Sequence, residues 1–219
     1  MKPERHPHWG NAILQAEADL ARNMPTVWAA RQKYPNWQPQ WIQHRSLQIT
    51  ELAEWCYQHQ PKVILELGSG WTTFVMARYA CEFRSRLVAV EENNDWRTSG
   101  VLGDLPDWAH VNWWMSRVTG DNVTRHYEEL PPDLPEIDLL YVDGPNCDAF
   151  GRSMIGSDAV RVVEAGARPK HVLFDMRHNA VDLFRERVEG YHWEPGGSYE
   201  LSKPWYLRAC RHHSWFWRK

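Results

Sequence analysis

Acidic side chains end four of the five apolar segments that the middle of the sequence offers as strands. Glu66, Glu91, Asp143 and Asp175 each stand at, or directly after, the end of such a segment. A single acid there can cap the following helix. Four acids at one edge of a sheet concentrate negative charge in the way that functional sites do. The pattern favours a ligand site, with capping and solubility as the structural alternative.

The turn Gly68-Ser69-Gly70 follows the first segment, in "VILELGSGWTT". Glycines let the chain turn tightly and let a ligand approach the backbone. The first N–H groups of the following helix favour a negatively charged group. Glu91 lies 21 residues after Gly70, a spacing at which a carboxylate can accept the hydroxyls of a ribose. This half of the sequence therefore predicts an adenosine-type cofactor site.

The turn does not match a nicotinamide site well. It supplies only two glycines of the G-x-G-x-x-G pattern, and threonine stands where a third would be. Glu66 would repel a pyrophosphate but suits a cofactor with a cationic amino group. S-adenosylmethionine has such a group and no phosphate. An NAD-dependent oxidoreductase is the alternative that these residues disfavour.

Several segments resemble class I S-adenosylmethionine-dependent methyltransferases. "VILELGSGWTT" resembles their motif I, E/D-x-G-x-G, and "LVAVEENNDW" their second motif. "IDLLYVDGP" and "HVLFDMR" resemble the fourth motif and the fifth strand. The residues of these motifs are most similar to a bacterial-type branch distantly related to the catechol O-methyltransferase-like group. The resemblance covers about residues 62–184.

The resemblance implies a set of cofactor-binding residues and S-adenosylhomocysteine as the product. Glu66 would lie near the methionine end of the cofactor, and Glu91 would hold the ribose. Glu92 or Asn93, together with Ser116, would lie near the adenine. The full set is Glu66, Gly68, Ser69, Gly70, Thr72 (in place of a third glycine), Glu91, Glu92, Asn93, Ser116 and Asp143.

The resemblance also raises the question of a divalent metal. In catechol O-methyltransferase-like members, an aspartate after strand four and an Asp-Asp or Asp-Asn pair after strand five bind a metal, and such oxygen ligands suit Mg²⁺. Asp143 and Asp175 match, but Met176 follows Asp175, and Asn179 could substitute only if the backbone permits. We therefore assign no metal ligand.

Methyl transfer needs positioning and, for an oxygen or nitrogen acceptor, proton removal. Asp143, Asp175 and His178 are the candidate catalytic bases because they follow strands four and five. A catalytically silent cofactor-binding protein is the alternative from outside the enzymes.

Substrate recognition is expected outside the motifs. Arg152 and Arg177 could bind an anionic group of a small-molecule substrate, or could pair with the same acids. Trp41 could wall an apolar pocket. The segment 119–135 is expected to be a loop, and His213, in the pair "HH", is expected to be exposed.

The elements that must position these residues alternate between strand and helix. This alternation predicts a Rossmann-like, doubly wound, mostly parallel seven-stranded sheet with ligands at the carboxyl ends of its strands. Two extended runs between Tyr191 and His213 predict an antiparallel edge. Helices are expected over 11–33 and 46–60. We expect an N-terminal helical extension over 1–45 and a methyltransferase domain over 46–219.

Composition narrows the class further. With 25 basic and 28 acidic residues in 219, the chain lacks the basic excess of a nucleic-acid binder. It has no apolar run of about 18 residues for a membrane span and no signal-peptide pattern. Four scattered cysteines fit a cytoplasmic protein. The 14 tryptophans fit packing of peripheral elements, a pocket wall or a homodimer interface.

Overall fold

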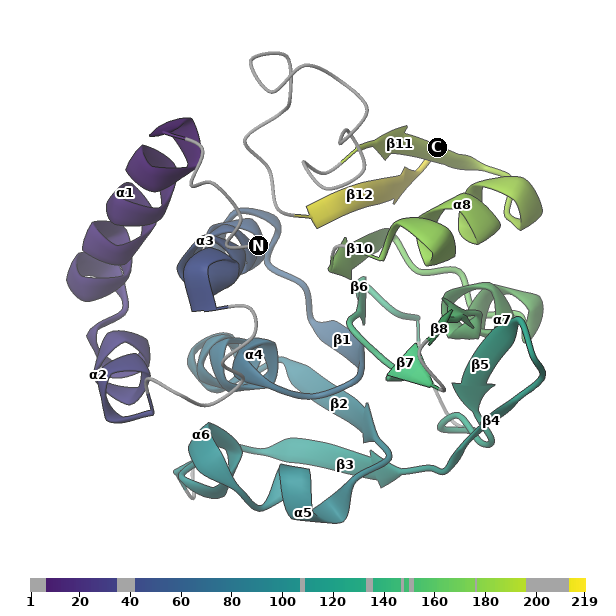
Figure 1. Cartoon of the computed structure of the whole chain (residues 1–219), viewed down its shortest axis with the longest axis horizontal. Helices are drawn as coiled ribbons and strands as arrows, with labels where there is room; N and C mark the ends of the chain where they lie inside the picture. The colour runs from purple at the N-terminus through teal and green to yellow at the C-terminus, as the bar shows by residue number, and fades with distance from the viewer. Residues whose placement is uncertain are drawn as a thin grey trace.

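A seven-stranded sheet forms the centre of the computed structural model, which describes residues 7–34, 42–106, 109–132, 136–146, 148–149, 152–175, 177–195 and 213–219. The strand order is β11-β12-β10-β6-β1-β2-β3 (Figure 1). The strands are β1 (Val63–Leu67), β2 (Arg86–Glu91), β3 (Val111–Met115), β6 (Leu139–Val142), β10 (His171–Asp175), β11 (Tyr191–Glu194) and β12 (His213–Arg218). The helices are α1 (Pro7–Asn23), α2 (Pro25–Lys33), α3 (Ile42–His59), α4 (Trp71–Phe83), α5 (Asn94–Arg97), α6 (Gly100–Gly103), α7 (Asp158–Glu164) and α8 (His178–Arg187).

The predicted mixture of parallel and antiparallel strands is confirmed. Strands β3, β2, β1, β6 and β10 pair in parallel, and β12 runs antiparallel between β10 and β11. Strands β11 and β12 form the predicted antiparallel edge, and β12 begins at His213, where the second expected run ended. Residues 196–212 lie outside the described part of the chain.

Helices cover both faces of the sheet, which explains why its strands are apolar almost throughout. Helices α3 and α4 pack on one face around Ile64, Leu139 and Tyr141. Helices α7 and α8 pack on the other face around Leu65 and Leu140. Because side chains alternate between the faces of a strand, Glu66 and Tyr141 lie on the face that α3 and α4 cover.

Two N-terminal helices form a further layer outside α3 and α4 (Figure 1). The expected helix over 11–33 is divided at Met24, and Pro25 begins α2, a position where its missing N–H costs nothing. Leu20, Val27 and Ile49 pack with Trp71, the first residue of α4. Trp71 is completely buried. This tryptophan therefore anchors the N-terminal helices to the sheet layer.

The segment expected to be a loop over 119–135 contains two strands. β4 (Val118–Gly120) and β5 (Thr124–Tyr127) form a hairpin, and β5 pairs in parallel with β9 (Ile155–Gly156). Asp121 closes the hairpin, because its carboxylate accepts the N–H groups of Val123 and Thr124 at 2.7 Å. A second small hairpin is formed by β7 (Asp148–Ala149) and β8 (Arg152–Ser153).

The boundary expected at residue 45 falls within the first turn of α3, which begins at Ile42. Helix α3 contacts both α1 and α4. Within the described ranges, no helix is both long and apolar enough to cross a membrane.

Candidate functional site

The four acids that end the strands lie at one edge of the sheet, as the sequence predicts. Leu67 pairs with both Val90 and Val142, so the residues that follow β1, β2 and β6 are level with one another. The pairing of Val142 with Phe174 places Asp175 at the same level. This edge is the carboxyl end of the parallel strands, where doubly wound sheets bind ligands.

The backbone N–H groups of the Gly-Ser-Gly turn are held by neighbouring residues. Gly68 has φ +85°, a conformation that favours glycine. Its N–H donates to the carbonyl of Val90 at 2.9 Å, and the N–H of Gly70 donates to Oγ1 of Thr73 at 2.9 Å. A Cβ at Gly68 would lie 2.6 Å from the nitrogen of Gly144. The turn therefore passes directly against the loop that follows β6. Both the backbone angle of Gly68 and this close approach require glycine.

Glu91 holds this turn through its carboxylate. Oε2 accepts the N–H of Ser69 at 3.0 Å and its hydroxyl at 2.5 Å. Oε1 accepts the N–H groups of Glu92 at 2.8 Å and Asn93 at 2.9 Å. Glu91 is only 6% exposed. The residue predicted to hold a ribose thus already accepts four hydrogen bonds from its own chain.

Glu66 is a buried carboxyl in which only one oxygen accepts a hydrogen bond from a described residue. It is 0% exposed, and Oε1 accepts the hydroxyl of Thr72 at 2.6 Å. Oε2 has no hydrogen-bond partner among the described residues. Burial raises the pKa of Glu66 well above its ordinary 4.5, although the hydroxyls of Thr72 and Thr73 oppose this rise, and the charges of Asp143 and Glu91 add a smaller increase. Thr72, predicted to bind cofactor, is itself fully buried and orients Glu66.

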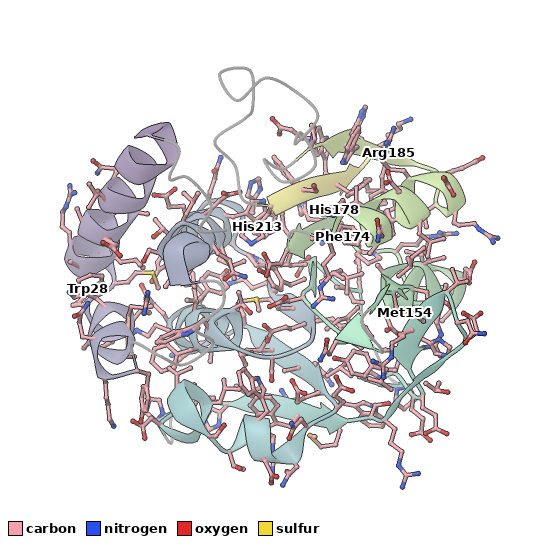
Figure 2. The ribbon with its side chains drawn as sticks, viewed as in Figure 1. Trp28, Met154, Phe174, His178, Arg185 and His213 are labelled. Carbon is pink, nitrogen blue, oxygen red and sulfur yellow. The ribbon has the colours of Figure 1, made fainter. Side chains whose placement is uncertain are left out.

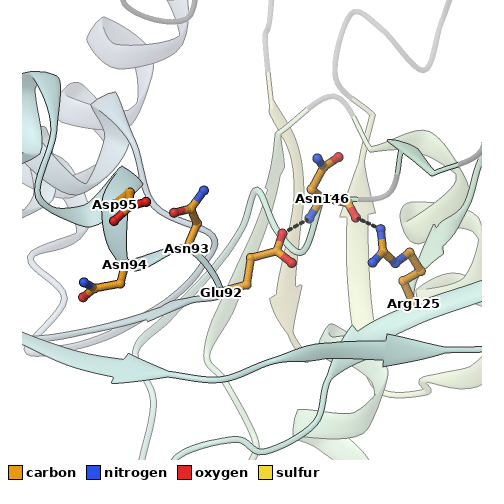
Figure 3. Close-up of a pocket in the computed structure, with 6 residues that line it drawn as sticks. All are labelled: Glu92, Asn93, Asn94, Asp95, Arg125 and Asn146. Carbon is orange, nitrogen blue, oxygen red and sulfur yellow. Dashed lines mark hydrogen bonds between the residues drawn. The ribbon is translucent and has the colours of Figure 1, made fainter.

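An open pocket of about 550 Å³ lies beyond the end of β2 (Figure 3). Its lining consists of Glu92, Asn93, Asn94, Asp95, Arg125 and Asn146. Oε1 of Glu92 accepts the N–H of Asn146 at 3.3 Å, and partial burial raises the pKa of Glu92. Asn93 caps α5 by accepting the N–H of Trp96 at 3.0 Å. Two of the predicted adenine-side residues, Glu92 and Asn93, therefore line one pocket.

Ser116, the third predicted adenine-side residue, braces the loop after β3. It is buried, and its N–H donates to the carbonyl of Glu91 at 3.0 Å. Its hydroxyl accepts the N–H of Glu129 at 2.9 Å. Ser116 therefore lies beside the backbone of Glu91, while its hydroxyl is used within the chain.

Asp143 is paired with Arg177. The guanidinium of Arg177 lies 3.4 Å from Oδ1 of Asp143, and it also donates to the carbonyls of Asp143 and of Pro145, the latter at 2.9 Å. The alternative role for Arg177, an ion pair with one of the acids, is thus present. A cation at this carboxylate does not fit a magnesium ligand set. The described residues contain no group of three or more His, Cys, Asp or Glu that could hold a metal.

Asp175 belongs to a buried chain of hydrogen bonds. Its Oδ2 accepts Nε2 of Gln48 at 2.6 Å, and the same amide nitrogen lies 3.3 Å from the hydroxyl of Tyr141. That hydroxyl is 2.9 Å from Nε2 of His213, whose Nδ1 lies 3.4 Å from Oε1 of Glu51. The chain connects α3, β6, β10 and β12. It is the part of the site that no motif indicates.

The expectation that His213 is exposed was wrong. Its side chain is 1% exposed, at the start of β12 beside α3 (Figure 2). Burial lowers the pKa of His213, but the hydrogen bond and charge of Glu51, with the charges of Asp175 and Asp143, raise it more, so the net pKa lies above 6.5. The acids around the imidazole therefore favour its charged form.

Of the three remaining predicted residues, only His178 has a side chain within the described part of the chain. His178 is exposed at the start of α8 (Figure 2). The side chain of Arg152 and all of Trp41 lie outside the described part of the chain.

Besides Tyr141 and His213, sequence reasoning missed two buried polar groups at this edge. Gln48 is 1% exposed on α3, one turn before Leu52. A polar residue on the apolar stripe of a helix is the signal that could have revealed it. Tyr127 is 1% exposed on β5, and a Cβ on Gly144 would lie 2.4 Å from its hydroxyl. No local signal distinguishes Tyr127, because its hairpin was expected to be a loop.

Comparison with known proteins identifies the fold. No protein-family model matches the chain, and none of the curated proteins matches its sequence. The structure of the methyltransferase PaMTH1 from Podospora anserina bound to SAH is similar at a TM-score of 0.52 and 13% identity, over 95% of this chain and 88% of that one. Cofactor-bound Rv0187 from MTB gives 0.47 at 15% identity, over 78% and 79% of the two chains. The plantazolicin methyltransferase BpumL with a triazolic analogue and SAH gives 0.44 at 8%, over 96% and 99%.

We base the assignment of the fold on PaMTH1. At 13% identity, this similarity does not indicate a branch of methyltransferases within the fold. The order and direction of the strands agree with the sheet that the sequence predicts. The chain has a Rossmann-like methyltransferase fold.

Proposed function

We propose that the protein is an S-adenosylmethionine-dependent methyltransferase that acts on a small-molecule acceptor. The observation that carries this proposal is Glu66, a fully buried carboxyl with an oxygen that has no partner among the described residues. A buried acceptor without a partner is costly, and a cationic group placed beside it would offset that cost. The similarity in fold to PaMTH1 supports the same proposal.

The residues around the turn fit this cofactor better than a dinucleotide. The charges of Glu91 and Asp143 lie close enough to interact with Glu66 at the turn, and they would repel a pyrophosphate. Glu66 would hold the amino group at the methionine end, and Thr72 would keep its carboxyl in place. The first N–H groups of α4 would attract the carboxylate of that end.

The adenosine half would lie toward β2. Glu91 is the proposed acceptor for the ribose, and the pocket lined by Glu92 and Asn93 would take the adenine (Figure 3). Ser116 would help to hold Glu91 in place, because its N–H donates to the backbone carbonyl of Glu91.

When bound, S-adenosylmethionine supplies a methyl group for in-line displacement, and the chain has to orient the acceptor and remove its proton. Asp175 is the base we favour, because it ends β10 at the carboxyl edge of the sheet and Gln48 holds its Oδ2 in place through a hydrogen bond of 2.6 Å. Asp143 is paired with Arg177 and is better suited to fixing the loop after β6. His178 is the exposed alternative.

The remaining parts of the proposal concern the setting of the enzyme. We propose a cytoplasmic protein with a small-molecule acceptor and no nucleic-acid partner, on the grounds of its charge balance of 25 basic to 28 acidic residues and its scattered cysteines. A homodimer and substrate roles for Arg152 and Trp41 also stay proposals. So does the division into an extension over 1–45 and a domain over 46–219.

Calorimetry with three ligands tests the proposal. We expect S-adenosylmethionine and S-adenosylhomocysteine to bind and NAD not to bind. Binding of NAD without binding of S-adenosylhomocysteine would overturn the assignment in favour of an oxidoreductase. Binding of S-adenosylhomocysteine, with no methyl transfer to a broad panel of small-molecule acceptors, would instead support a catalytically silent binding protein.

A further inference from the structure

The carboxylate of Glu91 has no acceptor position left for a ligand. A carboxylate offers about four lone-pair sites. Four donors fill them: the N–H and hydroxyl of Ser69, and the N–H groups of Glu92 and Asn93. Both side chains are buried, with Glu91 6% and Ser69 7% exposed. A ribose can reach this carboxylate only if one of the four donors leaves.

Three of these donors are fixed and one can rotate. The N–H groups of Glu92 and Asn93 belong to the chain directly after β2, next to the capped start of α5. The backbone of Ser69 is held on both sides, because its carbonyl accepts Nε1 of Trp96 at 3.0 Å and the neighbouring Gly68 is bonded to Val90. The hydroxyl of Ser69 turns about a single side-chain bond. It is the donor that can leave without moving the backbone.

We infer that the Ser69 hydroxyl occupies, in the free protein, the position on Glu91 that a cofactor hydroxyl takes on binding. Ser69 is then a specificity-determining residue: its rotation exposes one acceptor site, and its hydrogen bond to Glu91 opposes binding. This inference rests on the proposed function. The exchange is balanced, since one O–H donor leaves Oε2 and one ribose O–H replaces it.

This exchange has a consequence for which ribose hydroxyl is read. Only one acceptor position becomes free, so Glu91 can accept one of the two hydroxyls of the ribose and not both. The other hydroxyl must find its partner elsewhere. In the wild type, removing either hydroxyl should cost no affinity through Glu91, because Ser69 keeps its hydrogen bond when no ribose hydroxyl replaces it. In Ser69→Ala, removing the hydroxyl that Glu91 accepts should cancel the gain in affinity, whereas removing the other should leave that gain.

The test is calorimetry of the full chain with S-adenosylhomocysteine and its 2′-deoxy and 3′-deoxy analogues. We expect Ser69→Ala to bind S-adenosylhomocysteine about five- to tenfold more tightly than the wild type, the worth of one net hydrogen bond. The gain should persist with one deoxy analogue and vanish with the other. Ser85→Ala is the matched control, because Ser85 bonds to the carbonyl of Pro61 beside the N-terminal end of β2, and its affinities should equal those of the wild type.

Two kinds of failure are distinguishable. If the wild type does not bind S-adenosylhomocysteine, the proposed function fails. If the wild type binds but Ser69→Ala binds equally or more weakly, or gains equally with both deoxy analogues, the displacement of Ser69 is refuted while the cofactor assignment stands.

Discussion

Cofactor binding should release a proton from Glu66. In the free protein, burial holds the pKa of this carboxyl well above 4.5, so it is neutral over a range of pH in which an ordinary glutamate is charged. A cationic amino group beside it favours the charged form and lowers that pKa. Between 4.5 and the raised pKa, binding therefore expels up to one proton, and affinity rises with pH by up to about tenfold per unit.

The magnitude expected for a variant follows from the contacts of the carboxyl. Oε1 is already used by Thr72, so Oε2 offers one charge-assisted hydrogen bond to the ligand. Glu66→Gln keeps the acceptor for Thr72 and places N–H groups where the cation would lie. We expect a loss of about 1.5–3 kcal/mol, roughly ten- to 150-fold in affinity.

The assay is titration calorimetry with S-adenosylhomocysteine in two buffers of different ionisation enthalpy, repeated from about pH 5 to about pH 7.5, below the range of an α-amino group. The buffer dependence of the heat counts the protons released. Glu164→Gln, an exposed acid at the end of α7, is the charge-matched control and should behave as the wild type. The reasoning is refuted if the wild type releases no proton and Glu66→Gln retains full affinity.

Three further predictions concern stability, measured by urea unfolding. Trp71→Ala should cost about 3–5 kcal/mol, because a fully buried indole joins the N-terminal helices to α4; a loss below about 1 kcal/mol would contradict that role. Tyr141→Phe should cost about 1–3 kcal/mol, because it removes the hydroxyl between Gln48 and His213, and an unchanged midpoint would mean that the buried chain contributes nothing. The pKa of His213 is raised on folding, so its contribution to stability is full below pH 6.5 and is lost as the pH rises through the pKa of the folded state. His213→Gln should therefore flatten this decline in stability with pH. An identical pH profile for the variant would exclude His213 as the source of the decline.

The sequence predicts the sheet and the position of its acids because both depend on local patterns. Apolar runs of strand length are followed by glycine or by an acid, and parallel pairing brings the ends of the strands to one edge. In the structure Leu67 pairs with Val90 and Val142, which brings the ends of these strands level. Motif spacing alone was enough to bring Glu66, Glu91 and Asp143 together.

What the sequence does not predict depends on contacts between distant residues. Gln48 meets Asp175 across 127 positions, and Glu51 meets His213 across 162. The local sequence of His213, a pair of histidines, contains nothing that indicates a buried strand. The occupation of Glu91 by Ser69 was also unforeseen, because spacing identifies an acceptor but not the groups that already donate to it.

The position of β12 has a consequence for how the protein folds. In the described part of the chain, β11 pairs with β12 and with no other strand, so it cannot join the sheet before β12 has entered beside β10. The first residue of β12 closes a contact with Glu51 across 162 positions, and such long-range closure is entropically costly and slow. Strands β1, β2 and β3 are neighbours in both sequence and space and have no such requirement. We expect the amide protons of β11 and β12 to gain protection together, and last, as the chain refolds.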